Sequence, residues 1–196
     1  MKRMIVAALL LIGTTAASAQ VFFGLNGGAG VESTTGNANG ITIGAGADFG
    51  FINTTVGTFG LSACRSIGIG TAAHTGLGMM FVSRGWHEGT AFILGAGIDL
   101  RSTVDTPYGQ TIEDNGALRE SISYRDRKGY GVLLRAGVSF KWNLYITGSV
   151  AFGTFSADKD VYSMHHTPTG IHYDGYVSTP TDCSYFTLGV NIGFRF

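Results

Sequence analysis

The C-terminal segment of the chain, residues 183–196, reads CSYFTLGVNIGFRF and constrains the fold more than any other stretch. Every second residue from Phe186 to Phe196 is apolar, and the positions between them include Asn191 and Arg195. A strand points successive side chains to opposite faces, so this pattern predicts a strand with one apolar face and one mixed face. The apolar face needs an apolar neighbour along its whole length.

The same alternation recurs along the rest of the chain. The further segments are 21–31, 41–51, 59–70, 90–101, 130–140 and 142–153, with a weaker one at 76–84. Tight connections at 53–55, 85–89 and 141–143 alternate with longer polar stretches at 32–39, about 71–76, 104–128 and 158–182. Alternating short and long connections between strands are typical of an up-and-down transmembrane barrel. We therefore expect an all-β, antiparallel transmembrane β-barrel of about eight strands, with short periplasmic turns and longer extracellular loops.

The N-terminal segment has the features of an export signal. Lys2 and Arg3 precede an apolar run at 4–12, and small residues follow as far as Ala19. This order of charged, apolar and small residues describes a secretory signal peptide, and the apolar run is far shorter than the roughly 20 residues that span a bilayer. We expect residues 1–19 to be a cleaved signal peptide and residues 20–196 to be one barrel domain.

The composition fits a chain with lipid on its outside. Charged residues make up 13% of the chain, against about 25% in ordinary soluble domains. The 13 basic and 13 acidic residues balance, which gives no reason to expect nucleic acid as a partner. A barrel leaves no strand edge unpaired in hydrocarbon, and the 31 glycines suit a narrow interior with little volume to fill.

The signal peptide, the period of two and the terminal GFRF together resemble the small outer-membrane β-barrel proteins of Gram-negative bacteria, of the OmpX and OmpA-barrel kind. The resemblance covers residues 20–196. It implies insertion into the bacterial outer membrane after export, contact with outer-membrane lipids, and recognition by the barrel-assembly machinery. In that family the machinery reads aromatic residues at alternate positions of the last strand, which Phe194 and Phe196 occupy here. Asn191 stands where the family commonly has glycine.

Charged residues of the inward parity predict a polar network in the lumen. They are Asp48, Asp99, Arg101, Arg135 and Arg195. An eight-stranded barrel has an interior just wide enough for side chains, so opposite charges there favour a plug of paired groups. The alternative is that these residues line a small pore.

Three histidines, His165, His166 and His172, fall in one long polar stretch. Imidazoles are good metal ligands, but this spacing does not define a closed site. We expect a solvated loop, with no metal and no cofactor. His74 and His87 could supply a base in a lipid-modifying barrel enzyme, but no spacing matches a nucleophile motif, so we do not expect an enzyme.

Two further features raise questions about the strands. Cys64 and Cys183 fall on strands that we expect not to be neighbours, which disfavours a disulfide. Arg65 has the parity of the lipid-facing residues, where an arginine near the midplane costs about 2–4 kcal/mol. Either a bulge shifts the register around it, or Arg65 lies nearer a rim.

The sequence therefore favours a structural or surface-interaction role. In this interpretation the lumen is plugged, and the loops at 104–128 and 158–182 meet an extracellular ligand or a host surface. The alternatives are a small-solute diffusion channel and a lipid-modifying barrel enzyme. A soluble secreted β-sandwich would also show alternating strands, but it has no need for an apolar outer band.

Overall fold

The structure is a computed structural model that describes residues 21–35, 38–69, 71–84, 89–102, 108–114, 118–167 and 169–196. Within these ranges only the backbone is described at 38, 108–114, 118–127, 164–167 and 171–174. The predicted signal peptide lies outside the described residues and stays a prediction. The part of the chain that the structure describes includes no helix long and apolar enough to cross a membrane.

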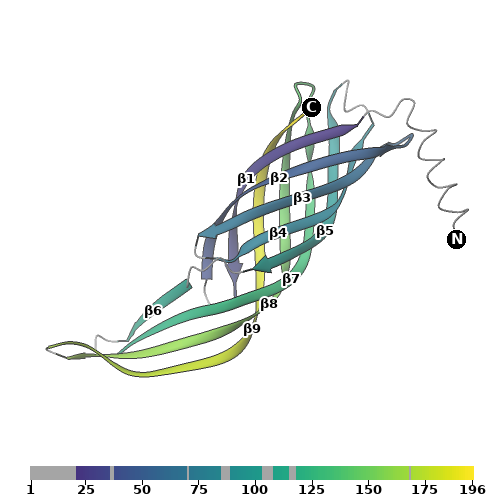
Figure 1. The fold of residues 1–196 in the computed structure, drawn as a ribbon. Coiled ribbons are helices and arrows are strands. Elements are labelled where there is room, and N and C mark those ends of the chain that lie inside the picture. Colours follow the sequence, from purple (N-terminus) through teal and green to yellow (C-terminus); the bar gives the residue numbers. More distant parts are fainter. Residues whose placement is uncertain are drawn as a thin grey trace, which may run out of the picture.

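The described residues form nine strands in one antiparallel sheet (Figure 1). They are β1 (Phe22–Thr34), β2 (Ala38–Asn53), β3 (Gly57–Ile69), β4 (Ala73–Ser83), β5 (Ala91–Ser102), β6 (Tyr108–Asp114), β7 (Leu118–Ser139), β8 (Leu144–Thr167) and β9 (Gly170–Arg195). The strand order is β5-β4-β3-β2-β1-β9-β8-β7-β6, and an additional pairing joins β5 to β7. That pairing closes eight strands into a barrel and leaves β6 outside the ring. The predicted barrel of about eight strands is confirmed.

One rim of the barrel carries the short connections, the start of β1 and the end of β9, and we call it the turn rim. It includes the turn at 54–56 and the turn at 140–143. The start of β1 meets the end of β9 at this rim, where Gly24 pairs with Arg195. Asn143 has a φ of 62°, a left-handed conformation that asparagine tolerates better than most residues. The opposite end of the barrel is called the loop rim.

Strands β7, β8 and β9 continue far past the loop rim. The pairing of β1 with β9 ends at Thr34 and Tyr185, but β8 and β9 stay paired as far as Thr167 and Gly170. Together with β6 and the first part of β7, they form an extension that leans away from the barrel (Figure 1), and we call residues 108–114, 118–127, 157–167 and 170–183 the finger. A register shift in β7 between Arg125 and Lys128 marks its base, and bulges of this kind bend strands.

The finger corrects part of the sequence interpretation. The stretches at 104–128 and 158–182 were expected to be loops, but most of their described residues are strand. The same correction applies at the barrel wall, where Glu32 belongs to β1 and His74 to β4. Outside a membrane both faces of a sheet meet water, so such strands lose the alternation by which a sequence reveals them.

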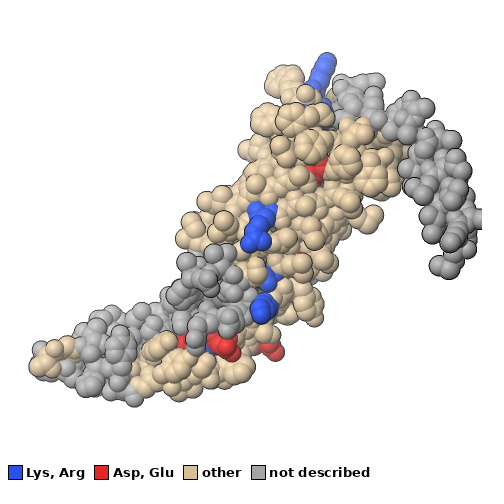
Figure 2. Space-filling model, in the orientation of Figure 1, with Lys and Arg blue, Asp and Glu red and all other residues tan. Residues whose placement is uncertain are grey.

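The two faces of the barrel wall differ as the alternation predicts. Apolar side chains cover the outside, with exposures such as 67% for Phe92, 49% for Leu188 and 57% for Phe194. Figure 2 shows one outer face that is mostly tan along the barrel, with a few charged side chains on it. An apolar exterior of this kind lies stably in hydrocarbon and not in water. Near the turn rim, Trp142 and Phe196 are 85% and 73% exposed, as expected of an aromatic girdle.

Arg65 lies on this outer face. The only register shift between β2 and β3 falls between Gly50 and Ile52, and the β3–β4 ladder is regular where Arg65 pairs with Thr75. The bulge considered from the sequence is therefore wrong at this position. Since β3 ends at Ile69, Arg65 lies in the loop-rim part of the wall.

Candidate functional site in the barrel lumen

Toward the turn rim, Asp48 of β2 and Arg135 of β7 form an ion pair across the lumen. Arg135 donates from Nη1 to Oδ1 at 2.6 Å and from Nη2 to Oδ2 at 3.0 Å, the bidentate geometry of a strong guanidinium–carboxylate pair. Asp48 Oδ2 also accepts from Asn26 Nδ2 at 3.0 Å and from the Tyr145 hydroxyl at 2.8 Å. Because Asp48 is only 1% exposed, these four donors replace its hydration.

Toward the loop rim, His74 of β4 joins two carboxylates. Its Nδ1 lies 2.8 Å from Asp99 Oδ2, and its Nε2 lies 2.5 Å from Glu32 Oε2. Arg101 donates to the other oxygen of Glu32, and the Tyr185 hydroxyl donates to Asp99 Oδ2 at 2.7 Å. An imidazolium donates from both ring nitrogens, so the position of His74 between two carboxylates favours its charged form. Two carboxylates, one guanidinium and one imidazolium then balance in charge.

Apolar layers lie beyond each charged cluster. On the turn-rim side the buried cluster consists of Phe22, Met80, Val82, Ala91, Ile93 and Tyr145. On the loop-rim side, the Arg101 guanidinium lies over the rings of Phe155 and Tyr185, 4.6 and 4.2 Å from their centroids. Such cation–π contacts stabilise a desolvated guanidinium. Leu133 packs against the same layer.

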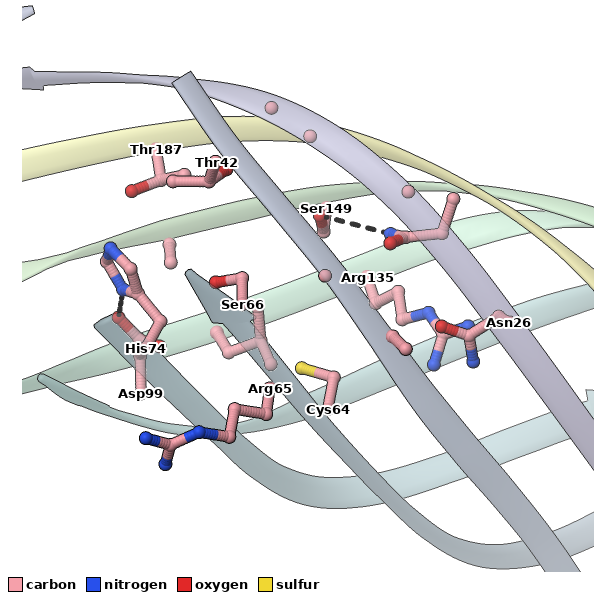
Figure 3. A pocket seen from close by; sticks show the side chains of 18 of the residues that line it. Asn26, Thr42, Cys64, Arg65, Ser66, His74, Asp99, Arg135, Ser149 and Thr187 are labelled. Carbon is pink, nitrogen blue, oxygen red and sulfur yellow. Dashed lines mark hydrogen bonds and ion pairs between the residues drawn. The ribbon is translucent and has the colours of Figure 1, made fainter. Parts of the chain in front are cut away.

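A small polar cavity lies between the two clusters. Its volume is about 80 Å³, and its lining includes His74 and Asp99 at one end and Asn26 and Arg135 at the other. Figure 3 shows Cys64 and Ser66 beside this cavity, whereas the Arg65 side chain points away from it. The cavity has room for a few water molecules and is much smaller than the ~300–1,000 Å³ of a small-molecule site.

Glycines make room for these clusters in the narrow lumen. A Cβ atom added at Gly24 would lie 2.8 Å from the Tyr145 hydroxyl oxygen. At Gly46 an added Cβ would lie 2.9 Å from Asn26 Oδ1 and from Cys64 Cβ. The inward glycines therefore serve as the spaces into which larger side chains from other strands project.

The structure distributes the five charged residues singled out from the sequence over three places. Asp48 and Arg135 form the first cluster, and Asp99 and Arg101 belong to the second. Arg195 binds the turn at 140–143, where its Nη2 donates to the Phe140 carbonyl at 2.8 Å and its backbone N–H to the Asn143 carbonyl at 2.8 Å. The single network expected from the sequence is therefore two ion-pair clusters and a contact that fastens the last strand to a turn.

Sequence reasoning missed Glu32 altogether and considered His74 only as a possible catalytic base, not as a member of the lumen network. Both were placed in polar loops, yet Glu32 is 1% and His74 6% exposed inside the lumen. The available signal was parity, because both residues continue the inward positions of their own strands. Polar lumen residues near a rim resemble loop residues, which hid that signal.

The second cluster does not have the arrangement of a catalytic base. A histidine that activates a serine needs a ring nitrogen free to accept the hydroxyl proton. In His74 one nitrogen faces Asp99 and the other faces Glu32, so neither is available to Ser66 or another hydroxyl. The geometry thus favours a structural role for the only described His–Asp pair.

The remaining histidine and cysteine candidates give less support for a functional site. The side chains of His165, His166 and His172 lie outside the described residues, as does His87. Among the side chains that the structure describes, no group of three or more His, Cys, Asp and Glu is placed to hold a metal ion. Cys64 and Cys183 are free thiols on β3 and β9, which are not neighbours in the barrel.

An eight-stranded antiparallel barrel with an apolar exterior and a polar, packed interior is a membrane-spanning β-barrel of the small outer-membrane type. Two solved barrels from Pseudomonas aeruginosa are similar to this chain. The N-terminal β-barrel domain of OprF is 13% identical, with a TM-score of 0.41 over 88% of this chain and 97% of that one. The outer membrane protein OprG is 12% identical, with a TM-score of 0.48 over 91% and 96%. No protein-family model and no curated protein sequence matches the chain.

Proposed function

We propose that this protein is a bacterial outer-membrane barrel with a closed lumen, exported by its signal peptide, that presents the finger to an external ligand or host surface. The observation that carries the proposal is the lumen itself. Two ion-pair clusters and two apolar layers fill it in series and leave a cavity of about 80 Å³ between the clusters. A solute path would need these four layers to separate, including the bidentate pair of Asp48 and Arg135.

The finger supplies a surface for recognition. Tyr176 and Val177 are 48% and 62% exposed on β9, and the exposed polar residues Ser178 and Thr179 follow them. The Tyr176 hydroxyl donates to Asp160 at 2.8 Å, and the ring of Tyr176 lies 4.9 Å from that of Tyr162. These contacts order the finger, and ordered tyrosines are effective in recognition because they offer a large, amphipathic contact area.

The barrel-assembly machinery is the proposed partner of the last strand. Phe194 is 57% exposed on the outer face, and the Phe196 ring lies 6.0 Å from Phe23 at the turn rim. Both aromatic side chains are thus presented outward, where another protein or lipid can contact them.

The closed lumen is tested by single-channel recording of the refolded protein in a planar bilayer. A gel that compares heated and unheated samples shows whether the barrel is folded. We expect folded protein without stepwise conductance, since two ion-pair clusters and two apolar layers lie across the lumen. Stable conductance steps would contradict the closed lumen and would favour a small-solute channel.

The role of the finger is tested by removing it while keeping the register. Ser156 pairs with Asp182 and Ser102 pairs with Lys128, so residues 157–181 and 103–127 can each be replaced by an Asn-Gly turn. Proteoliposomes carrying the full chain and the shortened barrel are then compared for adsorption to cultured host cells and to immobilised matrix protein. We expect both barrels to fold and only the full chain to adsorb; equal adsorption would contradict the role of the finger.

A further inference from the structure

The guanidinium of Arg65 lies among apolar side chains on the outer face of the barrel. Arg65 is exposed, and the outward residues next to it along β3 and β4 include Ile67 at 58% exposure and Leu77 at 44%. Its Nη1 donates to Thr75 Oγ1 at 3.1 Å, which is its one hydrogen bond to the described residues. A guanidinium has five N–H donors, so most of those of Arg65 are left for a partner outside the chain.

The position of Arg65 places that partner at the level of lipid headgroups. Arg65 lies four residues before the end of β3. At about 3.3 Å per residue and a strand tilt of roughly 40°, its Cα lies on the order of 10 Å below the loop rim. A long basic side chain keeps its stem along apolar surface and extends its charge toward the interface. The guanidinium then reaches the headgroup region of the outer leaflet.

A second cation and several hydroxyl groups share this part of the face. Arg65, Thr75, Leu100 and Tyr130 form one outward row across β3, β4, β5 and β7. Tyr130 is 72% exposed, and the exposed Lys128 follows two residues away at the loop rim. With strands about 4.8 Å apart and about 3.3 Å per residue, three strand intervals and two residues along β7 separate the Cα atoms of Arg65 and Lys128 by roughly 16 Å along the wall.

On β3, β4 and β5 no acidic side chain neutralises Arg65, whereas the exposed Asp182 lies two strands from Lys128 and accepts a hydrogen bond from Ser156. Among the described residues, the outward positions of β3, β4 and β5 are apolar, small or hydroxylic apart from Arg65. Figure 2 shows blue atoms on an otherwise tan stretch of the barrel, with red atoms near the lowest of them, toward the finger. The patch is therefore complementary to a ligand that has negative charge at the rim and apolar chains below it.

We propose that Arg65 and Lys128 bind the phosphate groups of a phosphorylated lipid in the outer leaflet, with Thr75 and Tyr130 as additional hydrogen-bonding groups. Phosphate oxygens match the planar fork of a guanidinium, which binds them bidentately. The acyl chains of the lipid lie against Leu61 and Leu77, on the turn-rim side of Arg65, which a free phosphate ion would leave exposed. This inference is independent of whether the lumen conducts and of what the finger contacts.

The test is a titration of the folded full-length barrel in detergent, followed by native mass spectrometry, with bisphosphorylated lipid A and with the same lipid after removal of both phosphates. We expect the wild type to bind the phosphorylated lipid at least tenfold more tightly. Arg65→Ala should remove most of this preference, and Arg65→Ala with Lys128→Ala should abolish it. Arg65→Lys, which keeps the charge but not the fork, should lie between.

Arg84→Ala is the matched control, because Arg84 is also exposed but lies at the turn rim beside the Thr55 carbonyl. It should leave the phosphate preference unchanged, and the heat-dependent gel shift should be the same for all variants. Three results would each overturn the proposal. The wild type and Arg65→Ala could bind the phosphorylated lipid equally, or Arg84→Ala could lose as much of the phosphate preference as Arg65→Ala. The wild type could also show no preference for the phosphorylated lipid. Full competition by inorganic phosphate alone would overturn the lipid as the ligand.

Discussion

The pair of Asp48 and Arg135 gives the sharpest stability prediction. Arg135→Ala leaves the carboxylate of Asp48, which is 1% exposed, in the lumen without its counter-charge. Removing one partner of a buried ion pair costs about 3–5 kcal/mol. Asn26 and Tyr145 still donate to Asp48 in the variant, so we expect a loss near the lower end, about 3 kcal/mol. With a urea slope of ~2 kcal/mol/M, the unfolding midpoint falls by roughly 1.5 M.

The assay is urea unfolding of the barrel in lipid vesicles, followed by tryptophan fluorescence. A double-mutant cycle separates the pair from the effect of truncation. The cycle consists of Asp48→Asn, Arg135→Met and the double variant. The double variant removes both charges, keeps most of the volume and leaves no unpaired ion, so it should be more stable than Arg135→Met alone. The exposed Arg84 supplies the control, and Arg84→Ala should change stability by less than about 0.5 kcal/mol.

Two results would refute this reasoning. If Arg135→Ala unfolds within about 0.5 kcal/mol of the wild type, the guanidinium is not part of a packed cluster. If the double variant loses the full sum of the single losses, the two side chains are not energetically coupled, whatever their distance.

Three further predictions concern other parts of the barrel. His74→Phe should lower stability by about 3 kcal/mol in the same urea assay, because it leaves Glu32 and Asp99 with one cation between them; an unchanged midpoint would contradict the charge balance of that cluster. Asn143→Val should cost about 1–2 kcal/mol because of the left-handed φ, whereas Asn143→Gly should be nearly neutral, and equal losses would show that the backbone conformation is not the cause. Deleting Phe196 should reduce the folded fraction in cell membranes without changing refolding of the purified protein, and normal membrane levels would remove its role in assembly.

The sequence predicts the barrel wall because the membrane requires it. Each strand must have an apolar outside, so alternation around Leu188 or Leu134 identifies the strands and their faces. The same parity also places Asp48 and Arg135 inside. Parity does not predict which inward side chains contact one another across the lumen. Those contacts depend on the stagger between strands, which no single strand reveals. The bond between Asp48 of β2 and Arg135 of β7 crosses the lumen and joins strands that are not neighbours.

The sequence interpretation failed where the lipid constraint ends. Glu32 and His74 lie in strands near the loop rim, and residues 157–167 lie beyond it, so neither stretch has a continuous apolar face. Polar side chains then resemble a loop, whether the backbone is paired or not. In the finger, strand structure is maintained by pairing with neighbours such as Val161 with Val177, which a single sequence does not reveal.

The continuity of β9 also determines how the protein resists force. A pull on the finger at the closed end of the hairpin, where Thr167 pairs with Gly170, is carried along β9 straight into the barrel wall. There the strand has eleven paired positions with β1 on one side and the ladder to β8 on the other. Tension along the strand loads these hydrogen bonds together in shear, so they do not open one after another. In the proposed role of the finger, a bound surface is therefore attached to a mechanical anchor whose strength comes from the whole wall.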